Sequence, residues 1–387
     1  MSEIDAVRLE SEVYPVVKIH AFGEIKNGGT PSSDEANWDG DIPFITPPDL
    51  NGLDSKSVAS VGRTITELGL KQGSNLVENG VIISGRAPVG YVGVVVTPSA
   101  FNQGCKAICT AQNHRYVAYA LTASKSNLQV LANGTTFSEI SSTALANYAI
   151  PLPPLEIQRR IADYLDRETA EIDAAVADLD RYVELLEKRR RAKITFAVEG
   201  KSNLVKDNST ESHPVANLGL VAHAYQPETL SMEALNQSGT FPVFGANGII
   251  GRHDNFNHEQ PQVVIACRGT CGAVNWTLPK SWINGNAMVI NPHAEKLRKD
   301  FLFYVLEIAD YSLVITGSAQ PQIIRESLYR LRVPLPPLET QRRIADYLDR
   351  ETTEIDSLIA DSTRLRDLLL KRRSVLITEV VTGRKQV

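Results

Sequence analysis

The chain has 387 residues, of which 43% are hydrophobic and 22% are charged, and its formal net charge is −5 at pH 7. This length predicts two or three folded units with a sizeable core, and the composition excludes a disordered or low-complexity protein. A weakly acidic chain does not bind nucleic acid through its overall charge, so any contact with DNA must come from local patches.

No apolar run approaches the roughly 18 residues of a membrane helix, and the acidic N-terminus lacks the apolar core of a signal peptide. We therefore expect a cytoplasmic protein without a membrane partner, in which thiols stay reduced. The four cysteines form two C-x-x-x-C pairs, Cys105 with Cys109 and Cys267 with Cys271. Zinc sites favour other spacings with turn residues between the ligands, so we expect structural thiols and no metal site.

Residues 1–150 alternate short apolar runs with turn signals, which predicts a mixed α/β domain. Strands are expected at 43–48, 80–84 and 91–96, helices at 64–70 and 116–123, and a polar loop at 132–136. Residues 141–148 then lead into a proline-rich hinge.

The hinge belongs to a stretch that the chain contains twice. Residues 151–169 read PLPPLEIQRRIADYLDRET, and residues 334–352 differ from them only by Thr340 in place of Ile157. The offset is 334 − 151 = 183 residues, which is far beyond the period of about 20–50 residues of a solenoid and indicates a duplicated module.

Each copy of the repeat predicts a long helix. The prolines keep the chain extended until the helix can begin, and no further proline or glycine occurs before Gly200 and Gly383. Apolar residues then recur in steps of four and three, as in the a/d seam of a coiled coil. The first seam contains Ile172, Val176, Leu179, Val183 and Leu186; the second contains Ile355, Ile359, Leu369, Leu376 and Val380, with Ser362 and Arg366 interrupting it.

A charged helix of this length is unstable alone, and each helix has the other as an available partner. We therefore predict an antiparallel coiled coil; the alternative is two amphipathic helices that pack only on their own domains. The arginines near the C-terminal end of each helix are expected to neutralise the helix dipole or pair with Glu184 and Glu187 rather than bind phosphate. These arginines are Arg189, Arg190, Arg372 and Arg373.

The second half repeats the order of parts of the first: a glycine-rich opening, a strand with an arginine turn, a helix, a polar loop, a hinge and a long helix. Its expected strands are 241–244, 262–267, 272–277 and 287–290, followed by a helix at 299–309 and a polar loop at 315–322. The predicted fold is α/β (mixed α+β), with two globular domains separated by the paired helices and related by a pseudo-two-fold axis. The parts are residues 1–150, 151–200, 201–333 with a leading polar linker, and 334–387.

The sequence contains none of the common catalytic motifs. The phosphate-binding loop, the dinucleotide-binding glycine pattern, H-E-x-x-H, G-x-S-x-G and a base-methylation motif of the Asn-Pro-Pro-Tyr type are all absent. We therefore expect neither a catalytic site nor a cofactor in this chain.

Two divergent domains, each followed by PLPPLE-x-QRRIADYLD and a long helix, resemble the specificity subunit of a type I restriction–modification system. Shorter segments that also resemble this family are 28–31, 41–46, 66–70, 84–90 and 102–104 in the first domain, and 244–251 and 268–272 in the second.

The resemblance implies that each globular domain is a target-recognition domain that reads one half of a bipartite sequence in double-stranded DNA. It also implies that the helices set the spacing of the two halves and dock two modification (methyltransferase) subunits. The chain itself would catalyse nothing: S-adenosylmethionine, ATP and Mg would serve partner subunits, which include restriction/translocase subunits.

Candidate DNA contacts are polar side chains in loops and turns. Arg86 and Arg268 each follow an apolar strand in a glycine-flanked turn, from which arginine can reach guanine O6 and N7 or a phosphate. The other candidates are Lys26, Asn27, Thr30, Asn102, Gln103, Lys106, Thr135, Thr136, Asn247, Arg252, Ser318, Gln320 and Gln322.

Candidate partner-binding residues are identical in the two copies of the repeat. They are Gln158, Arg159, Arg160 and Tyr164, and Gln341, Arg342, Arg343 and Tyr347. Identity between otherwise divergent halves predicts two copies of one partner on two equivalent surfaces.

Two other classes of function remain open on the residues alone. One is a two-domain adaptor that binds proteins without DNA, which a test of duplex DNA binding in the presence of modification subunits would separate. The other is a nuclease with a dispersed carboxylate site, which Mg-dependent cleavage by the chain alone would support.

Overall fold

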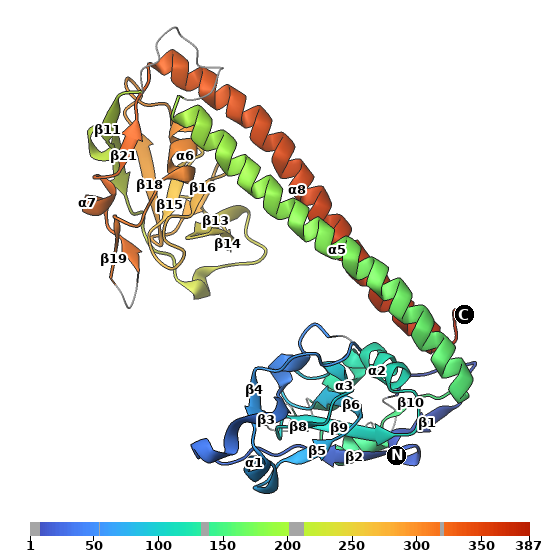
Figure 1. Cartoon of the computed structure of the whole chain (residues 1–387). Coiled ribbons are helices and arrows are strands. Elements are labelled where there is room, and N and C mark those ends of the chain that lie inside the picture. The colour runs from blue at the N-terminus through green and yellow to red at the C-terminus, as the bar shows by residue number, and fades with distance from the viewer. Residues whose placement is uncertain (1–7, 54, 133–138, 201–212, 318–320) are drawn as a thin grey trace. The chain divides into compact units, whose positions relative to one another are not determined.

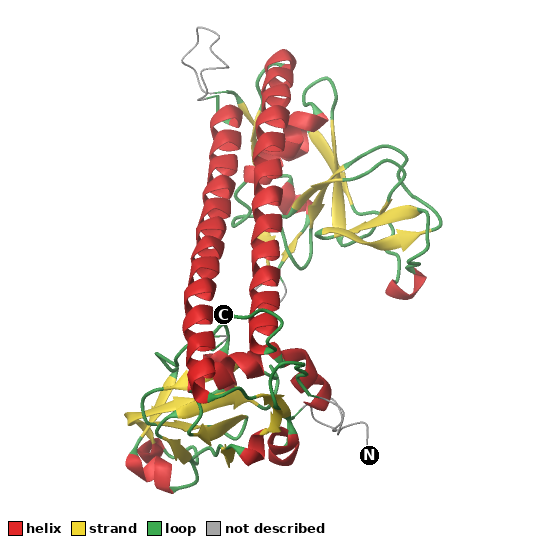
Figure 2. Ribbon diagram, turned by 90° about the vertical axis from the view of Figure 1, so that its right-hand side faces the viewer, coloured by secondary structure: helices red, strands yellow, loops and turns green. Residues whose placement is uncertain are grey.

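The computed structural model describes residues 8–53, 55–132, 139–200, 213–317 and 321–387. The chain forms two compact units. Unit 1 comprises Met1–Leu179 and Arg364–Val387, and unit 2 comprises Asp180–Thr363. Each unit combines strands, gathered in one domain, with a stretch of both long helices (Figure 2).

The two long helices agree with the sequence prediction. Helix α5 spans Leu155–Val198 and helix α8 spans Leu338–Val381, each with 44 residues. Each follows a short strand and a proline-rich hinge: β10 (Ala149–Pro151) pairs with β1 (Val16–Lys18), and β21 (Arg332–Pro334) pairs with β11 (Val215–Asn217). The same lead-in therefore directs both helices out of their domains.

Unit 1 is built around an antiparallel sheet with the order β2-β9-β6-β7. Its strands are β2 (Gly23–Asn27), β9 (Cys105–Thr110), β6 (Gly80–Ser84) and β7 (Val92–Val95). A second sheet has the order β4-β3-β8-β5, with β4 (Arg63–Ile65), β3 (Trp38–Ile45), β8 (Ser99–Phe101) and β5 (Asn75–Val77). The helices of the domain are α1 (Glu67–Lys71), α2 (His114–Ala123), α3 (Lys125–Ala132) and α4 (Ser142–Asn147). Helix α2 packs on β6 and β7 (Figure 1), and the core between them is fully buried.

Unit 2 repeats this plan with shorter elements. Its main sheet has the order β12-β18-β15-β16, with β12 (Ala222–Tyr225), β18 (Ala287–Pro292), β15 (Val263–Ala266) and β16 (Val274–Trp276). A second sheet contains β14 (Gly248–His253), β13 (Phe241–Gly245) and β17 (Trp282–Ile283), and a small hairpin joins β19 (Ile315–Thr316) to β20 (Gln322–Ile323). The helices are α6 (Lys299–Ile308), which packs on the main sheet, and α7 (Arg325–Leu328).

Three local predictions are wrong in detail. The helix expected at 64–70 is divided, because the β-branched Thr64 and Ile65 belong to strand β4 and the helix begins only after Thr66. The Thr66 hydroxyl caps this helix by accepting a hydrogen bond from the Gly69 amide at 3.1 Å. The strand expected at 43–48 begins earlier, at Trp38, and ends before Pro47. The polar loop expected at 315–322 contains strands β19 and β20.

Within each unit the two long helices contact one another in antiparallel order. In unit 1 the first part of α5 meets the last part of α8, where Ile172, Leu376 and Val380 join one buried cluster. Their ion pairs repeat at the offset of 183 residues: Arg373 Nε lies 2.8 Å from Asp173, and in unit 2 Arg190 Nε lies 2.8 Å from Asp356. Mutual pairing of the helices is therefore the correct alternative in both units.

Two of these four arginines, Arg190 and Arg373, have the predicted structural role, but with other partners. Arg190 binds Asp356 and also Glu307, the latter at 2.5 Å, instead of Glu184 or Glu187. Glu184 is paired instead with Lys188. In each unit an arginine, Arg190 or Arg373, thus stands at a position of the seam where an uninterrupted apolar seam would have an aliphatic side chain, and it pairs with an aspartate of the other helix.

Each long helix is also bound to its own domain by a repeated set of side chains. The Tyr119 hydroxyl of α2 donates to Asp166 at 2.8 Å, and the Tyr304 hydroxyl of α6 donates to Asp349 at 2.6 Å. Both aspartates belong to the repeated sequence. Part of the identity between the two copies is therefore explained by packing inside the chain.

Candidate nucleic-acid interface

The arginine turn of unit 1, residues 85–90, leaves the end of strand β6. The Gly90 amide donates to the Ser84 carbonyl at 3.0 Å, and the Ser84 amide donates to the Tyr91 carbonyl at 2.8 Å. Gly90 has a φ of 86°, a conformation that favours glycine. The turn is closed at its base, and it presents Arg86 as an exposed residue.

The arginine turn of unit 2, residues 267–272, has the same construction at the end of β15. Gly272 donates to Ala266 at 3.0 Å and Ala266 donates to Ala273 at 2.8 Å, while Gly272 has a φ of 91°. Arg268 is exposed at the position equivalent to Arg86. Two turns of equal length, closed by equivalent hydrogen bonds, thus present one arginine each.

A second chain segment faces each arginine. In unit 1 the Ile140 amide donates to the Gly85 carbonyl at 2.8 Å, and in unit 2 the Ile323 amide donates to the Cys267 carbonyl at 3.0 Å. These bonds form isolated antiparallel bridges that set Glu139 opposite Arg86 and Gln322 opposite Arg268. The structure therefore brings together Gln322 and Arg268, two separately predicted DNA contacts.

In unit 1 the predicted contacts Lys26, Asn27 and Lys106 lie on neighbouring strands beside this turn. Asn27 and Lys106 face one another in the register of β2 and β9, and Lys106 Nζ donates to Asn27 Oδ1 at 3.2 Å. Only 5% of Lys106 is exposed, and burial lowers the pKa of its ammonium group, an effect that nearby Glu139 opposes. Lys106 therefore supports Asn27 and Glu139 from beneath the surface rather than projecting towards a ligand.

The remaining described candidates of unit 1 line the adjoining loops. The Thr30 hydroxyl donates to the side chain of Gln103, and both residues are exposed. Asn102 Oδ1 accepts a bond from the Gly104 amide at 3.0 Å, and the Gly104 carbonyl in turn accepts bonds from the Gly85 and Arg86 amides. These contacts connect the loops that carry Thr30, Asn102 and Gln103 to the arginine turn, whereas Lys26 pairs with Ala107 in the sheet.

In unit 2 Arg268 and Gln322 line a recess of about 430 Å³. The other polar side chains of this recess were not among the predicted contacts; they are Tyr225, Gln226, Arg325 and Glu326. When the main sheets of the two units are compared by their strand register, Tyr225 occupies the position of Lys26, and Met288 occupies the position of Lys106. Ser142 donates a hydrogen bond to Asn27, one of the predicted DNA contacts. The residue 183 positions later is Arg325, so the offset of the repeat could have identified Arg325 as a candidate from the sequence.

The other predicted contacts of unit 2 lie elsewhere or cannot be placed. Asn247 is exposed at the turn between β13 and β14, and Arg252 on β14 donates through Nε to the Gly239 carbonyl at 2.5 Å. Neither lines the recess around Arg268. Four candidates lie outside the described residues: Thr135, Thr136, Ser318 and Gln320.

Two of the predicted partner contacts are occupied within the chain. Gln158 is fully buried, donates to the Pro153 carbonyl and to Gln112 at 2.8 Å each, and accepts from the Asn113 amide at 3.1 Å. Gln341 is equally buried and makes the corresponding bonds to Pro336, Lys296 and Arg298. Because burial consumes their hydrogen-bonding groups, these glutamines attach the helices to their own domains, and their nomination as partner contacts is corrected.

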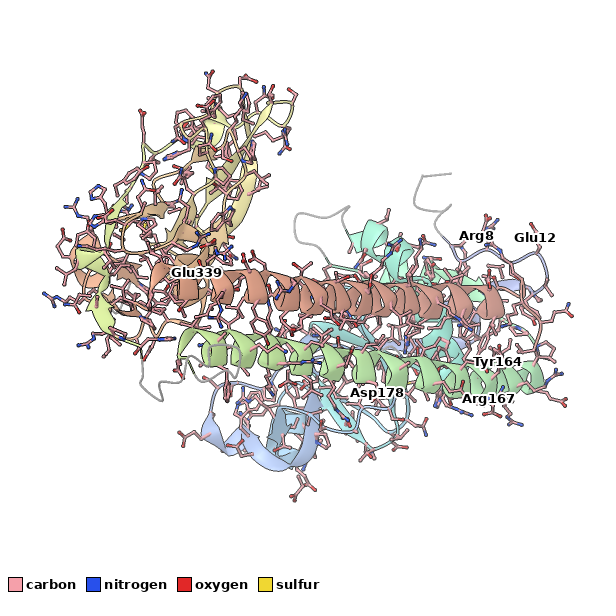
Figure 3. All side chains as sticks on the ribbon, turned by 90° about the horizontal axis from the view of Figure 1, so that it is seen from above. Arg8, Glu12, Tyr164, Arg167, Asp178 and Glu339 are labelled. Atoms are coloured by element: carbon pink, nitrogen blue, oxygen red, sulfur yellow. The ribbon has the colours of Figure 1, made fainter. Side chains whose placement is uncertain are left out.

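The other nominated residues of the repeat remain accessible. Arg159, Arg160, Arg342 and Arg343 are exposed, and Tyr164 and Tyr347 are half-buried. Lys385 Nζ lies 5.3 Å from the centre of the Tyr164 ring, and Lys193 Nζ lies 5.8 Å from that of Tyr347. Figure 3 labels Tyr164 and Arg167 on α5 and Glu339 near the start of α8, where Glu339 pairs with Arg342 at 2.6 Å.

The cysteines are free, and Cys105 and Cys267 are buried. Burial raises the pKa of Cys105 to about 12 and also raises the pKa of Cys109 and Cys267. Within the described ranges, no three His, Cys, Asp or Glu side chains gather as a group able to hold a metal ion. Among the described helices, none combines the length and apolar character that crossing a membrane requires.

Comparison with known proteins supplies a family for this arrangement. The sequence model of the family described as type I restriction modification DNA specificity domain matches residues 12–177 and 215–361. The type I restriction enzyme MjaIX specificity subunit of Methanocaldococcus jannaschii is 31% identical over 182 residues, which cover 45% of this chain and 41% of that protein. The EcoprrI specificity subunit of Escherichia coli is 22% identical over 370 residues, which cover 90% of each protein. The aligned region thus spans about two fifths of the first relative and nine tenths of the second.

Solved structures share the fold. A chain from work on complex assembly and conformational transition of the type I R-M system aligns with a TM-score of 0.65 at 16% identity, over 96% of this chain and 98% of that chain. The HsdS subunit from Thermoanaerobacter tengcongensis aligns with a TM-score of 0.50 at 16% identity, over 97% of this chain and 98% of that chain.

Proposed function

The chain belongs to the type I restriction modification DNA specificity domain family, and we propose that it acts as the DNA specificity subunit of a type I restriction–modification complex. Each globular domain, within 1–150 and 201–333, is a target-recognition domain for one half of a bipartite sequence. The chain is a non-catalytic subunit, and methyl transfer and ATP-driven reactions belong to its partner subunits in the cytoplasm.

One observation carries this proposal: the same arginine turn is built twice, on domains whose other surface residues differ. An arginine with free N–H groups can bind the O6 and N7 acceptors of guanine in the major groove. In both units a polar segment faces the arginine, so that neighbouring side chains can contact the adjacent bases or phosphates. Two unlike readers in one chain suit an asymmetric target with two separate halves.

The repeated helix starts provide the proposed docking surfaces for two modification subunits. With the glutamines occupied internally, the exposed residues among those nominated from the repeat are the arginine pairs Arg159–Arg160 and Arg342–Arg343. The long helices between the hinges are proposed to set the spacing of the half-sites.

The test is a DNA-binding measurement on the complex assembled with its modification subunits. Arg86→Ala and Arg268→Ala should each weaken binding to the selected target by about 1–3 kcal/mol, and each should relax the base preference in only one half-site. Lys296→Ala is the control, because Lys296 is an exposed basic residue outside the Arg268 recess. If neither arginine variant changed affinity relative to this control at fixed salt, the proposed reading surfaces would be wrong.

A mass measurement of the active methylating complex tests the partner proposal. Two modification subunits per chain are expected from the two equivalent helix starts. A single modification subunit in the intact active complex would contradict it.

A further inference from the structure

The two arginine turns differ in the residue that faces the arginine. In unit 1 Arg86 Nε donates to Glu139 Oε2 at 2.8 Å, with 49% of the arginine side chain and 30% of the glutamate side chain exposed. In unit 2 the neutral Gln322 occupies the position of Glu139. Within the described part of the chain, Arg268 forms no ion pair. The equivalent bridge therefore holds one arginine by a carboxylate and leaves the other without one.

Glu139 is itself held in place. The bond from the Ile140 amide to the Gly85 carbonyl fixes its backbone, and Lys106 Nζ lies 3.8 Å from its Oε1 atom. Lys106 is buried and bound to Asn27, so the support extends into the sheet. Unit 2 has Met288 in the place of Lys106, and thus lacks this support.

The contact between Arg86 and Glu139 has two physical consequences for a DNA ligand. Because Glu139 engages Nε, the guanidinium plane is oriented while its terminal amino groups, which bind no described protein group, remain available for two parallel bonds to a base edge. Orientation before binding reduces the entropy lost on binding. The carboxylate also repels a DNA phosphate, whereas guanine offers neutral acceptors.

We propose that Glu139 is a positioning residue that directs Arg86 to guanine in one half-site, whereas Gln322 leaves Arg268 able to bind either guanine or phosphate. The two domains then discriminate to different degrees at equivalent positions of the target. This inference rests on the proposed function, because it needs each turn to contact DNA.

The experiment selects bound sequences from random duplex DNA with the full complex and compares wild type, Glu139→Gln and Gln322→Glu. Glu139→Gln should bind DNA at least as tightly as wild type but lose its preference for guanine at one position by about tenfold, within the range that one bidentate contact supplies. Its affinity should fall more steeply with salt, by about one additional phosphate contact. Gln322→Glu should show the reverse in the other half-site, with a sharper guanine preference and a weaker dependence on salt.

Glu139→Asp serves as the conservative control, because a shorter carboxylate keeps the charge and should retain most of the guanine preference. Arg86→Ala combined with Glu139→Gln should be no less selective than Arg86→Ala alone, since the glutamate acts through the arginine.

The outcomes separate this inference from the proposed function. If wild type selected no bipartite sequence, the function itself would be wrong. If wild type selected such a sequence and both Glu139→Gln and Gln322→Glu left base preference and salt dependence unchanged, the function would stand and the positioning role would be overturned. If Glu139→Gln did not fold, Gln322→Glu would decide alone, because failure to sharpen its half-site would overturn the inference.

Discussion

Replacing Gln158 by alanine should loosen the attachment of α5 to its own domain. The substitution removes three hydrogen bonds and leaves the Pro153 carbonyl and the Asn113 amide without their partner. An unsatisfied buried polar group costs about 1–3 kcal/mol, and Gln112, the third partner, can turn towards water. For two such groups the expected loss is therefore about 2–6 kcal/mol, located at the start of α2, which Asn113 caps.

The suitable assay is hydrogen exchange of the full chain read by mass spectrometry, because a chain with two units need not unfold in one step. Amides at the start of α2 should exchange faster in Gln158→Ala, whereas those of α6 should not change. Gln341→Ala should give the opposite result, since Gln341 binds the Arg298 amide at the start of α6.

Arg159→Ala is the matched control, because Arg159 is the next residue of the same helix turn and is exposed. Surface substitutions of this kind change stability by about 0.5 kcal/mol or less. If the amides at the start of α2 were equally protected from exchange in Gln158→Ala and Arg159→Ala, the buried glutamine would not be what attaches α5 to its domain.

Three further predictions follow from the same contacts. Tyr119→Phe and Tyr304→Phe should each lower the free energy of unfolding of their unit by about 1–2 kcal/mol in urea titrations. Each substitution removes the hydrogen bonds of the hydroxyl with one aspartate and one threonine of the repeated sequence. No change in either unit would contradict the fastening role. Lys106→Met should leave the free energy of unfolding of unit 1 within about 1 kcal/mol of wild type. Unit 2 has methionine in the equivalent place, and a buried ammonium group is costly. A loss of several kcal/mol would show that Lys106 stabilises the sheet. Inserting one heptad after Leu179 and another after Ser362 should keep the seam in phase and lengthen both helices by roughly 10 Å. Selection from random-spacer DNA should then favour a spacer longer by about 3 base pairs, subject to the added twist of the duplex. If a folded, DNA-binding variant still selected the original spacer, the helices would not set the distance between the half-sites.

The long helices could be predicted from the sequence because their signals are local. Prolines precede each helix, no breaker interrupts it, and the apolar steps of four and three identify the contacting face. The same local reasoning located strand β6 and helix α2 within a few residues. It failed at Thr64–Leu70, where extended and helical signals lie next to each other and Thr66 decides the boundary by capping.

Residues that depend on pairing between distant segments could not be identified in this way. Glu139 has the wrong charge for a DNA contact when considered alone, and its role becomes apparent only when the bridge to Arg86 places it beside the guanidinium. Gln158 was nominated for a partner because identity between the copies does not distinguish an outer surface from an internal fastening. Burial distinguishes them, and burial depends on the whole domain.

The comparison of the two units indicates which residues a change of DNA target needs to alter. The attachment of each helix is the same in both units: a buried glutamine, a tyrosine bound to an aspartate, and an arginine–aspartate pair. The hydrogen bonds that close the arginine turn are also the same, as is its glycine of positive φ. The differences occur around the turn, where Glu139 and Lys106 in one unit are replaced by Gln322 and Met288 in the other. Since none of these replaced residues takes part in the helix attachments, a half-site preference can change while the helix attachments of that unit stay intact.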